Sequence, residues 1–456
     1  MGQPGKDTMS GLKTMIKKWA DDKLLVSVIR NAGYLGSSNT LIMGLSAFKG
    51  ILVSYLGAVE YGSLNIVILF ASNVNKLLSF RMGEFVIKYT GGYLAHQDKK
   101  RAGSSIKLAF IAETITSIFA FILLAILAPM AGRLLLKNAI PVGWIIFFGV
   151  TMLANAITES STAVMQLSNQ YKKIAAVALT QNIIATVWIV LAFVFDSGMF
   201  AVLMGYWVGK IINGLCMSFF ALLELSTLIG KHWWREPFSI LDNKRELMRF
   251  SFSTNISGTL SLIIRDSESL WAGYFFATSY QAGIYAFAFN IVSVVLMPVS
   301  QFHMATFPQI NQYISTSAWG PLRNLLKKTT AIVFIWIALC AGGFALLGRW
   351  VLSFYKKGEY LASYPLVLIL FIGFGFLNIL FWNRNVLLSF SRQNYPLYSY
   401  ALFGVLRILL MFLLVPRVGV IMQAILFSTF FAFSITFNAL EGLKEIKKRE
   451  NLVETV

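Results

Sequence analysis

The chain has 456 residues, of which 57% are hydrophobic and only 13% charged, and its mean hydropathy is +0.68. Soluble domains carry about 25% charged residues, so this composition excludes an ordinary soluble protein. The formal net charge of +19 would suit nucleic-acid binding, but the distribution of the basic residues along the chain argues against that class.

Twelve apolar segments follow one another along the chain, and each is long enough to cross a bilayer. A transmembrane helix needs about 20 mainly apolar residues, and these segments are too long for barrel strands. Since only helices and closed barrels satisfy the backbone in lipid, we predict an all-α polytopic membrane protein with about 12 transmembrane helices. The predicted spans are 33–56, 62–87, 105–128, 142–165, 173–195, 199–224, 250–277, 281–306, 328–354, 364–389, 396–415 and 419–440.

The basic residues in the connections predict the orientation of the chain. If the N-terminus lies in the cytoplasm, 26 Lys and Arg residues lie in cytoplasmic segments and six in external ones. Such an excess is typical of the cytoplasmic side of membrane proteins. We therefore expect both termini in the cytoplasm, and we interpret the basic excess as a topology signal rather than a nucleic-acid site. The first residues lack an apolar core with a cleavage site, so no signal peptide is expected.

Spaced matches between the two halves of the chain predict an internal duplication. The matched positions are Gly62 with Gly283, Gly132-Arg133 with Gly348-Arg349, Pro141 with Pro365, Gly149 with Gly373, Tyr171 with Tyr395, and Gly198 with Gly419. Because each half contains six spans, both halves enter the membrane in the same orientation. We predict two parallel six-helix bundles related by a pseudo-twofold axis along the membrane normal, with a substrate path between them.

The most polar connection divides the chain at its middle and sets the expected domain boundaries. We expect a cytoplasmic N-terminal segment (1–31), an N-terminal bundle (32–225), a cytoplasmic linker (226–249), a C-terminal bundle (250–441) and a cytoplasmic tail (442–456). The linker is the natural hinge between the bundles.

Seven basic residues lie within the predicted spans, where each costs about 2.5–3.5 kcal/mol at the bilayer centre. They are Lys49, Lys76, Arg81, Lys210, Arg265, Arg384 and Arg407. Lys76 belongs to a polar stripe on span 62–87, and Asn255 and Asp266 share a face of span 250–277. These charges must line water, pair with acids or reach an interface.

We expect five of these bases to line a cationic cavity that binds the substrate, together with two amides. The predicted binding residues are Lys49, Lys76, Arg265, Arg384, Arg407, Asn255 and Asn383. Arg265 could instead pair with Glu268 three residues later, and Arg81 and Lys210 could reach a membrane face. A cavity with net positive charge attracts an anionic substrate, and phosphate or diphosphate is the obvious class.

Embedded acids are fewer than embedded bases. Asp266, Glu113 and Glu159 are the candidates for coupling transport to a proton or another cation. A MATE-like exporter of cationic drugs is an alternative function, but it would favour an acidic cavity. A membrane enzyme of polysaccharide assembly is a further alternative. No metalloprotease, nucleophile-elbow or phosphate-loop motif occurs and the three histidines are scattered, so we expect no enzyme, no metal and no cofactor.

Several stretches resemble the polysaccharide-transporter family, the Wzx-type flippases of lipid-linked oligosaccharides, within the superfamily that includes the MATE exporters. They are LGAVEYGSLNI, DSESLWAGYFFATSYQAGIYAFAFNIV, MPVSQFHMATFPQI, LLGRWVLSFYKKGEYLASYP and VPRVGVIMQAI. Their order over about residues 30–440 carries the resemblance, since each is a Gly/Pro/Tyr pattern in apolar sequence.

The resemblance implies a V-shaped pair of six-helix bundles with alternating access to a central cationic cavity. The implied substrate is an undecaprenyl-diphosphate-linked oligosaccharide, such as an O-antigen repeat unit, moved from the cytoplasmic to the periplasmic leaflet of the bacterial inner membrane. Membrane lipids and a polysaccharide polymerase are the implied partners. Basic cavity residues are typical of the family, in agreement with the five bases proposed above.

Overall fold

A computed structural model describes residues 23–78, 82–241, 262–390, 392 and 394–454, and every regular element in this part of the chain is helical. The long helices are α2 (Lys23–Ser54), α3 (Ala58–Leu78), α6 (Lys99–Leu134), α7 (Val142–Ala154), α8 (Thr158–Leu167), α9 (Tyr171–Val194), α10 (Gly198–Leu228), α13 (Ser279–Ser315), α14 (Trp319–Phe354), α15 (Tyr364–Ile379), α17 (Asn394–Val418) and α18 (Val420–Glu454). Shorter elements are α4 (Met82–Phe85), η1 (Val86–Thr90), α5 (Gly91–Ala95), η2 (Trp233–Arg235), η3 (Phe238–Ile240), η4 (Leu262–Asp266), α12 (Glu268–Phe275), η5 (Tyr355–Gly358), η6 (Leu361–Ser363) and α16 (Trp382–Ser389).

The membrane-spanning helices coincide with the predicted spans. Within the described residues, nine helical segments are long and apolar enough to cross a bilayer, and the bent pair Ala58–Leu78 and Met82–Ala95 makes a tenth. Two predicted spans remain, 33–56 and 250–277. Helix α2 contributes the shorter apolar segment Asn39–Ser54, and span 250–277 is described only from residue 262. The all-α polytopic fold class is therefore confirmed.

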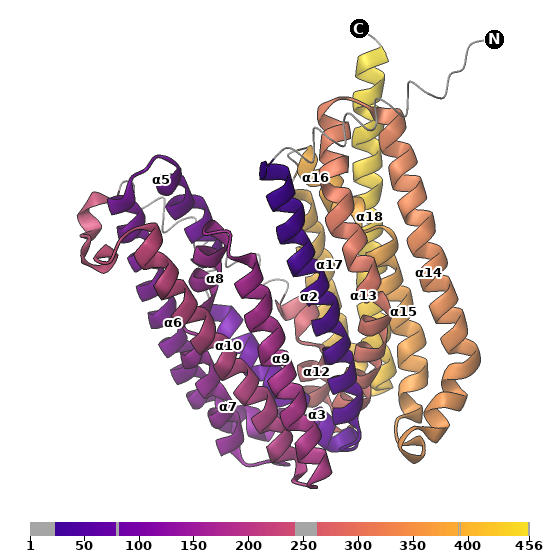
Figure 1. Cartoon of the computed structure of the whole chain (residues 1–456). Coiled ribbons are helices and arrows are strands. Elements are labelled where there is room, and N and C mark those ends of the chain that lie inside the picture. The colour runs from indigo at the N-terminus through magenta and orange to yellow at the C-terminus, as the bar shows by residue number, and fades with distance from the viewer. Residues whose placement is uncertain (1–22, 79–81, 242–261, 391, 393, 455–456) are drawn as a thin grey trace, which may run out of the picture.

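The helices form two groups that are splayed at one end of the molecule (Figure 1). Helices α6–α10 form one group and α13–α18 the other, while α2 and α3 lie between them. Helix α2 begins and α18 ends at the same end of the molecule, as an even number of membrane crossings requires.

The internal duplication predicted from sequence recurs in the local structure of the two halves. Pro141 precedes α7 and Pro365 lies in the first turn of α15, and each of these helices breaks before a second helix, α8 or α16. Gly198 and Gly419 both have positive φ, of 73° and 98°, at the turns that open the last long helix of each half. Glycine suits these turns because other side chains rarely adopt positive φ.

The two halves meet mainly where α3 packs along α13, while α2 packs on α9 and also contacts α13.

The described part of the linker is attached to the first half instead of lying free. Ser104 Oγ of α6 donates to the Pro237 carbonyl at 2.9 Å, and Lys107 Nζ donates to the Glu236 carbonyl at 2.8 Å. Residues 242–249 of the expected hinge lie outside the described residues.

Candidate functional site

A polar cavity of about 230 Å³ lies where α2, α3, α10 and α13 converge. Its polar lining comes from both halves of the chain. The polar residues are Ser46 and Lys49 of α2, Tyr61 and Asn65 of α3, Tyr206 of α10 and Asn290 of α13. Asn290 Nδ2 donates to Tyr61 Oη at 3.3 Å, so the two halves are joined across this cavity. Asn65 lies on span 62–87, whose polar stripe also contains Lys76.

Lys49 carries an uncompensated charge beside this cavity. The residue is only 7% exposed, and Nζ donates to Asn182 Oδ1 of α9 at 2.8 Å. Nζ also lies 5.7 Å from the centre of the Tyr206 ring. None of the carboxylates that the structure describes lies within 4 Å of this ammonium group. A buried cation without an anion is costly, so the position favours an anionic ligand.

Lys76 and Arg265 share one carboxylate at the junction of the two halves. Lys76 Nζ of α3 lies 3.3 Å from Asp266 Oδ2, and Arg265 Nε lies 2.9 Å from Asp266 Oδ1. The side chains of Lys76 and Arg265 are 58% and 46% exposed, and that of Asp266 is 25% exposed. This cluster therefore remains open to solvent or ligand.

Two more bases extend this cluster into a cation belt, which we define as Lys76, Lys210, Arg265 and Arg384. Lys210 of α10 lies near enough to Lys76 for their charges to repel. Arg384 of α16 is exposed, and it acts electrostatically on the same Tyr400 hydroxyl as Arg265. Among the described carboxylates, none pairs with Arg384. The belt thus reaches from the first half into the second.

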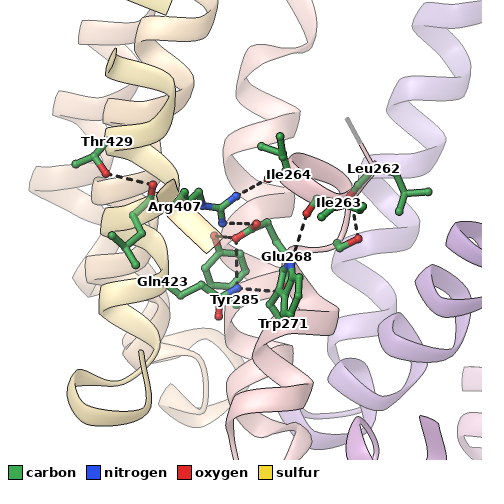
Figure 2. A network of polar contacts seen from close by, with 11 residues as sticks. Leu262, Ile263, Ile264, Glu268, Trp271, Tyr285, Arg407, Gln423 and Thr429 are labelled. Carbon is green, nitrogen blue, oxygen red and sulfur yellow. Dashed lines mark hydrogen bonds and ion pairs between the residues drawn. The ribbon is translucent and has the colours of Figure 1, made fainter. Parts of the chain in front are cut away.

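Arg407, which we expected in the cavity, is instead held in a buried network (Figure 2). It is 3% exposed, and it donates to a carboxylate oxygen of Glu268 and to the Ile264 carbonyl. Tyr285 Oη donates to the other Glu268 oxygen at 2.9 Å, and Gln423 Nε2 donates to the Glu268 carbonyl at 2.7 Å. These residues lie on five elements of the second half, η4, α12, α13, α17 and α18, and they fix the break between η4 and α12.

This network also corrects the alternative pairing of Arg265 with Glu268. Glu268 pairs with Arg407, 139 residues later, while Arg265 pairs with its neighbour Asp266. The π-helical turn η4 ends at Asp266, so the i,i+3 geometry of a regular helix does not apply there.

Glu113 of α6 caps the second half of a broken span. Its two carboxylate oxygens accept the backbone N–H groups of Glu159 and Ser160, at 2.9 and 3.2 Å, where α8 begins. A carboxylate is favourable at a helix N-terminus, where free N–H groups point outward. Asn75, Glu113, Asn155 and Glu159 also border a small polar cavity of about 30 Å³. Two of the three expected coupling acids, Glu113 and Glu159, therefore lie together.

The two amides that we predicted in the cavity do not line it in the described part of the chain. Asn383 is buried and donates to the Leu380 carbonyl at the break before α16, and Asn255 lies outside the described residues. Asn182, Tyr206 and Asn290 were not predicted, although an amide within an apolar span was an available signal for Asn182.

A group of contacts from the connection after α14 closes one end of the interface. We call Tyr355, Lys356, Glu359 and Tyr360 the latch. Glu359 Oε1 accepts the Ala58 N–H at 2.5 Å, capping α3. The other three latch residues donate to the end of α2: Tyr355 to Ile51 O at 2.9 Å, Lys356 to Tyr55 O at 2.6 Å and Tyr360 to Ser54 O at 2.7 Å.

Comparison with known proteins now decides the family. A model of the family described as "Polysaccharide biosynthesis protein" matches residues 51–355. The chain belongs to this family. The match confirms the resemblance drawn from the sequence. The inner membrane protein YghQ of Escherichia coli is 20% identical over 359 residues, which cover 77% of this chain and 99% of YghQ.

Solved structures share the fold of this family member. A lipid II flippase, MurJ, in an inward closed conformation has a TM-score of 0.71 and 12% identity, covering 91% of this chain and 89% of MurJ. An inward-facing multidrug resistance MATE transporter of the MOP superfamily has a TM-score of 0.65 and 11% identity, covering 89% of this chain and 94% of that one. These likenesses confirm the MATE-like arrangement of the helices.

Proposed function

We propose that this family member is a flippase of the bacterial inner membrane. It moves an oligosaccharide linked to undecaprenyl diphosphate, such as an O-antigen repeat unit, from the cytoplasmic to the periplasmic leaflet. Both termini lie in the cytoplasm, and the two bundles rock about the site between them. The protein acts as a transporter and not as an enzyme.

The observation that carries this proposal is the unpaired Lys49 ammonium beside a polar cavity. The amides and phenols around it suit sugar hydroxyls, because they offer both donors and acceptors. An exporter of cationic drugs would instead place acids at this position, since a buried ammonium repels a cationic ligand.

The cation belt supports binding of a diphosphate near the same cavity. Arg265 and Arg384 can each hold two phosphate oxygens, and Lys76 and Lys210 add compact positive charge. The belt has four positive charges, and the Asp266 carboxylate neutralises only one of them. The remaining positive charge suits a diphosphate, which carries more than one negative charge. The polyprenyl chain then stays in lipid while the headgroup enters between the bundles.

The latch supports alternating access. It joins the second half to the α2–α3 corner at the end that the predicted topology places in the periplasm. The helix groups are splayed at the opposite end (Figure 1). We therefore assign this conformation to the state in which the periplasmic side is closed, and rocking must break the latch before the headgroup can leave.

Complementation of a bacterial strain that lacks its own oligosaccharide flippase tests the proposed function. The wild-type chain should restore surface polysaccharide when the strain makes the matching repeat unit. Lys49→Ala should reduce this export at least about tenfold, because the anionic headgroup loses its buried partner. Lys100→Ala is the matched control, since this lysine is exposed at a helix start outside the cavity. Full export by Lys49→Ala, or resistance to cationic drugs in place of export, would contradict the proposal.

A further inference from the structure

The Asp266 carboxylate lies among the bases of the cation belt, where a bound anion would lie. Its two carboxylate oxygens contact different bases, Oδ2 with Lys76 and Oδ1 with Arg265. All three side chains are at least one quarter exposed, so another anion can reach the same two cations.

Buried neighbours on both sides fix the backbone that presents Asp266. Before it, the Ile264 carbonyl accepts a hydrogen bond from Arg407. After it, Ser267 Oγ donates to the Leu262 carbonyl and accepts from Asn73 Nδ2 of α3, each at 2.9 Å. The carboxylate therefore stands on a rigid turn, while Lys76 can move away on its long side chain.

We propose that Asp266 is an internal counter-anion that occupies the place of the substrate's diphosphate while the carrier is empty. The inference rests on the proposed function and adds the way in which the site selects its ligand. A diphosphate must displace the carboxylate from Lys76 and Arg265 to bind. A single carboxylate or a neutral glycolipid competes poorly, because it offers these bases no more charge than Asp266 does.

Displacement of Asp266 also links binding to movement. The contact of Lys76 with Asp266 joins α3 of the first half to η4 of the second. When phosphate oxygens replace the carboxylate, this ion pair between the halves is lost. Asp266 then lies beside the bound diphosphate, and repulsion between the two anions favours release once the site opens to the other side.

The test measures binding of farnesyl diphosphate and farnesyl monophosphate to the full-length chain in lipid nanodiscs. We expect Asp266→Asn to bind the diphosphate about fivefold to tenfold tighter than wild type, because two partly exposed ion pairs no longer compete. The monophosphate should gain by a larger factor than the diphosphate, so the preference for diphosphate should fall. Asp266→Glu, which keeps the charge, should bind like wild type and shows whether the effect comes from charge or from packing.

Equal or weaker diphosphate binding by folded Asp266→Asn would overturn the inference, as would tighter binding by Asp266→Glu. The outcomes separate it from the proposed function. If the wild type flips its substrate but Asp266→Asn binds the diphosphate no more tightly, only the inference is overturned. If Asp266→Asn binds the diphosphate more tightly but the wild type flips nothing, only the proposed function is overturned. No binding by either protein overturns both.

Discussion

Gly62 of α3 and Gly283 of α13 lie directly against each other where the two halves of the chain meet. A Cβ atom at Gly283 would lie 1.8 Å from the Ala58 carbonyl oxygen, and one at Gly62 would lie 2.1 Å from the Ser279 carbonyl oxygen. The sequence pairs these two glycines as equivalent positions of the internal repeat. Equivalent positions contact each other only close to the axis that relates them, so this pair lies near the pseudo-twofold axis.

Substitution of Gly283 by Ala should destabilise the protein, because the new methyl group meets backbone that cannot yield. Forcing extra atoms into a tight contact costs about 1–3 kcal/mol or more. Thermal unfolding of the purified protein in detergent, followed by tryptophan fluorescence, measures the loss. Gly342→Ala in α14 is the matched control, since no atom of the described residues lies within 4 Å of its added methyl group. Equal melting temperatures for the two variants would contradict the close approach of α3 and α13.

Arg407 and Glu268 should behave as one structural unit. Arg407→Met leaves the Glu268 carboxylate buried without its cation, which costs about 3–5 kcal/mol. The double variant Arg407→Met/Glu268→Gln removes both charges and should recover most of that loss. A double-mutant cycle of unfolding free energies checks the coupling. Additive effects of the two single changes would contradict the buried pair and favour the cavity position that the sequence suggested for Arg407.

Weakening the latch should open the cavity from the periplasmic side. In Glu359→Gln/Tyr360→Phe, α3 loses its charged cap and the α2 end loses a donor. Val53, which is fully buried and lines the cavity, can report on opening when it is replaced by Cys in a chain whose two native cysteines are Ser. We expect an impermeant maleimide added outside the cell to label Cys at this position several-fold faster.

Lys357→Ala is the control for the latch, because this lysine lies in the same connection but is exposed and makes no hydrogen bond or ion pair with the residues that the structure describes. Labelling that is unchanged by the double substitution, or accelerated equally by Lys357→Ala, would show that these hydrogen bonds do not hold the periplasmic side closed.

Glu113 should act as a helix cap rather than as a proton carrier. Glu113→Gln keeps an oxygen acceptor for the start of α8, so flipping should stay within about threefold of wild type, whereas Glu113→Ala should lose about 0.5–2 kcal/mol of stability. Flipping assays with and without an imposed pH gradient compare the two variants. Loss of the response to the gradient in a folded Glu113→Gln protein would instead identify this carboxyl as a coupling group.

The sequence predicted the spans well because hydrophobic length and turn residues are local signals. The matched glycines and prolines likewise mark turns and close contacts that depend on a few neighbouring residues. Contacts between residues on separate helices leave no such local signal in the sequence. Spacing along one helix could not show that Arg407 meets Glu268, or that Asp266 lies between Lys76 and Arg265, since each contact depends on how separate helices pack.

The positions of charged residues predicted only part of the site. It singled out Lys49, Lys76 and Arg384, but the neutral residues that surround the Lys49 ammonium were missed. The latch was missed for the same reason, because tyrosine hydroxyls that bond to backbone carbonyls leave no pattern in the sequence.

Reconstitution of the purified chain in proteoliposomes tests the central claim, that the cargo is anionic. Flipping of an oligosaccharide carried on a polyprenyl diphosphate is compared with flipping of the same glycan carried on an uncharged polyprenyl glycoside. We predict flipping of the diphosphate-linked form alone, reduced at least about tenfold by Lys49→Ala or Lys76→Ala. Equal flipping of both lipids, or of the uncharged lipid alone, would contradict the account.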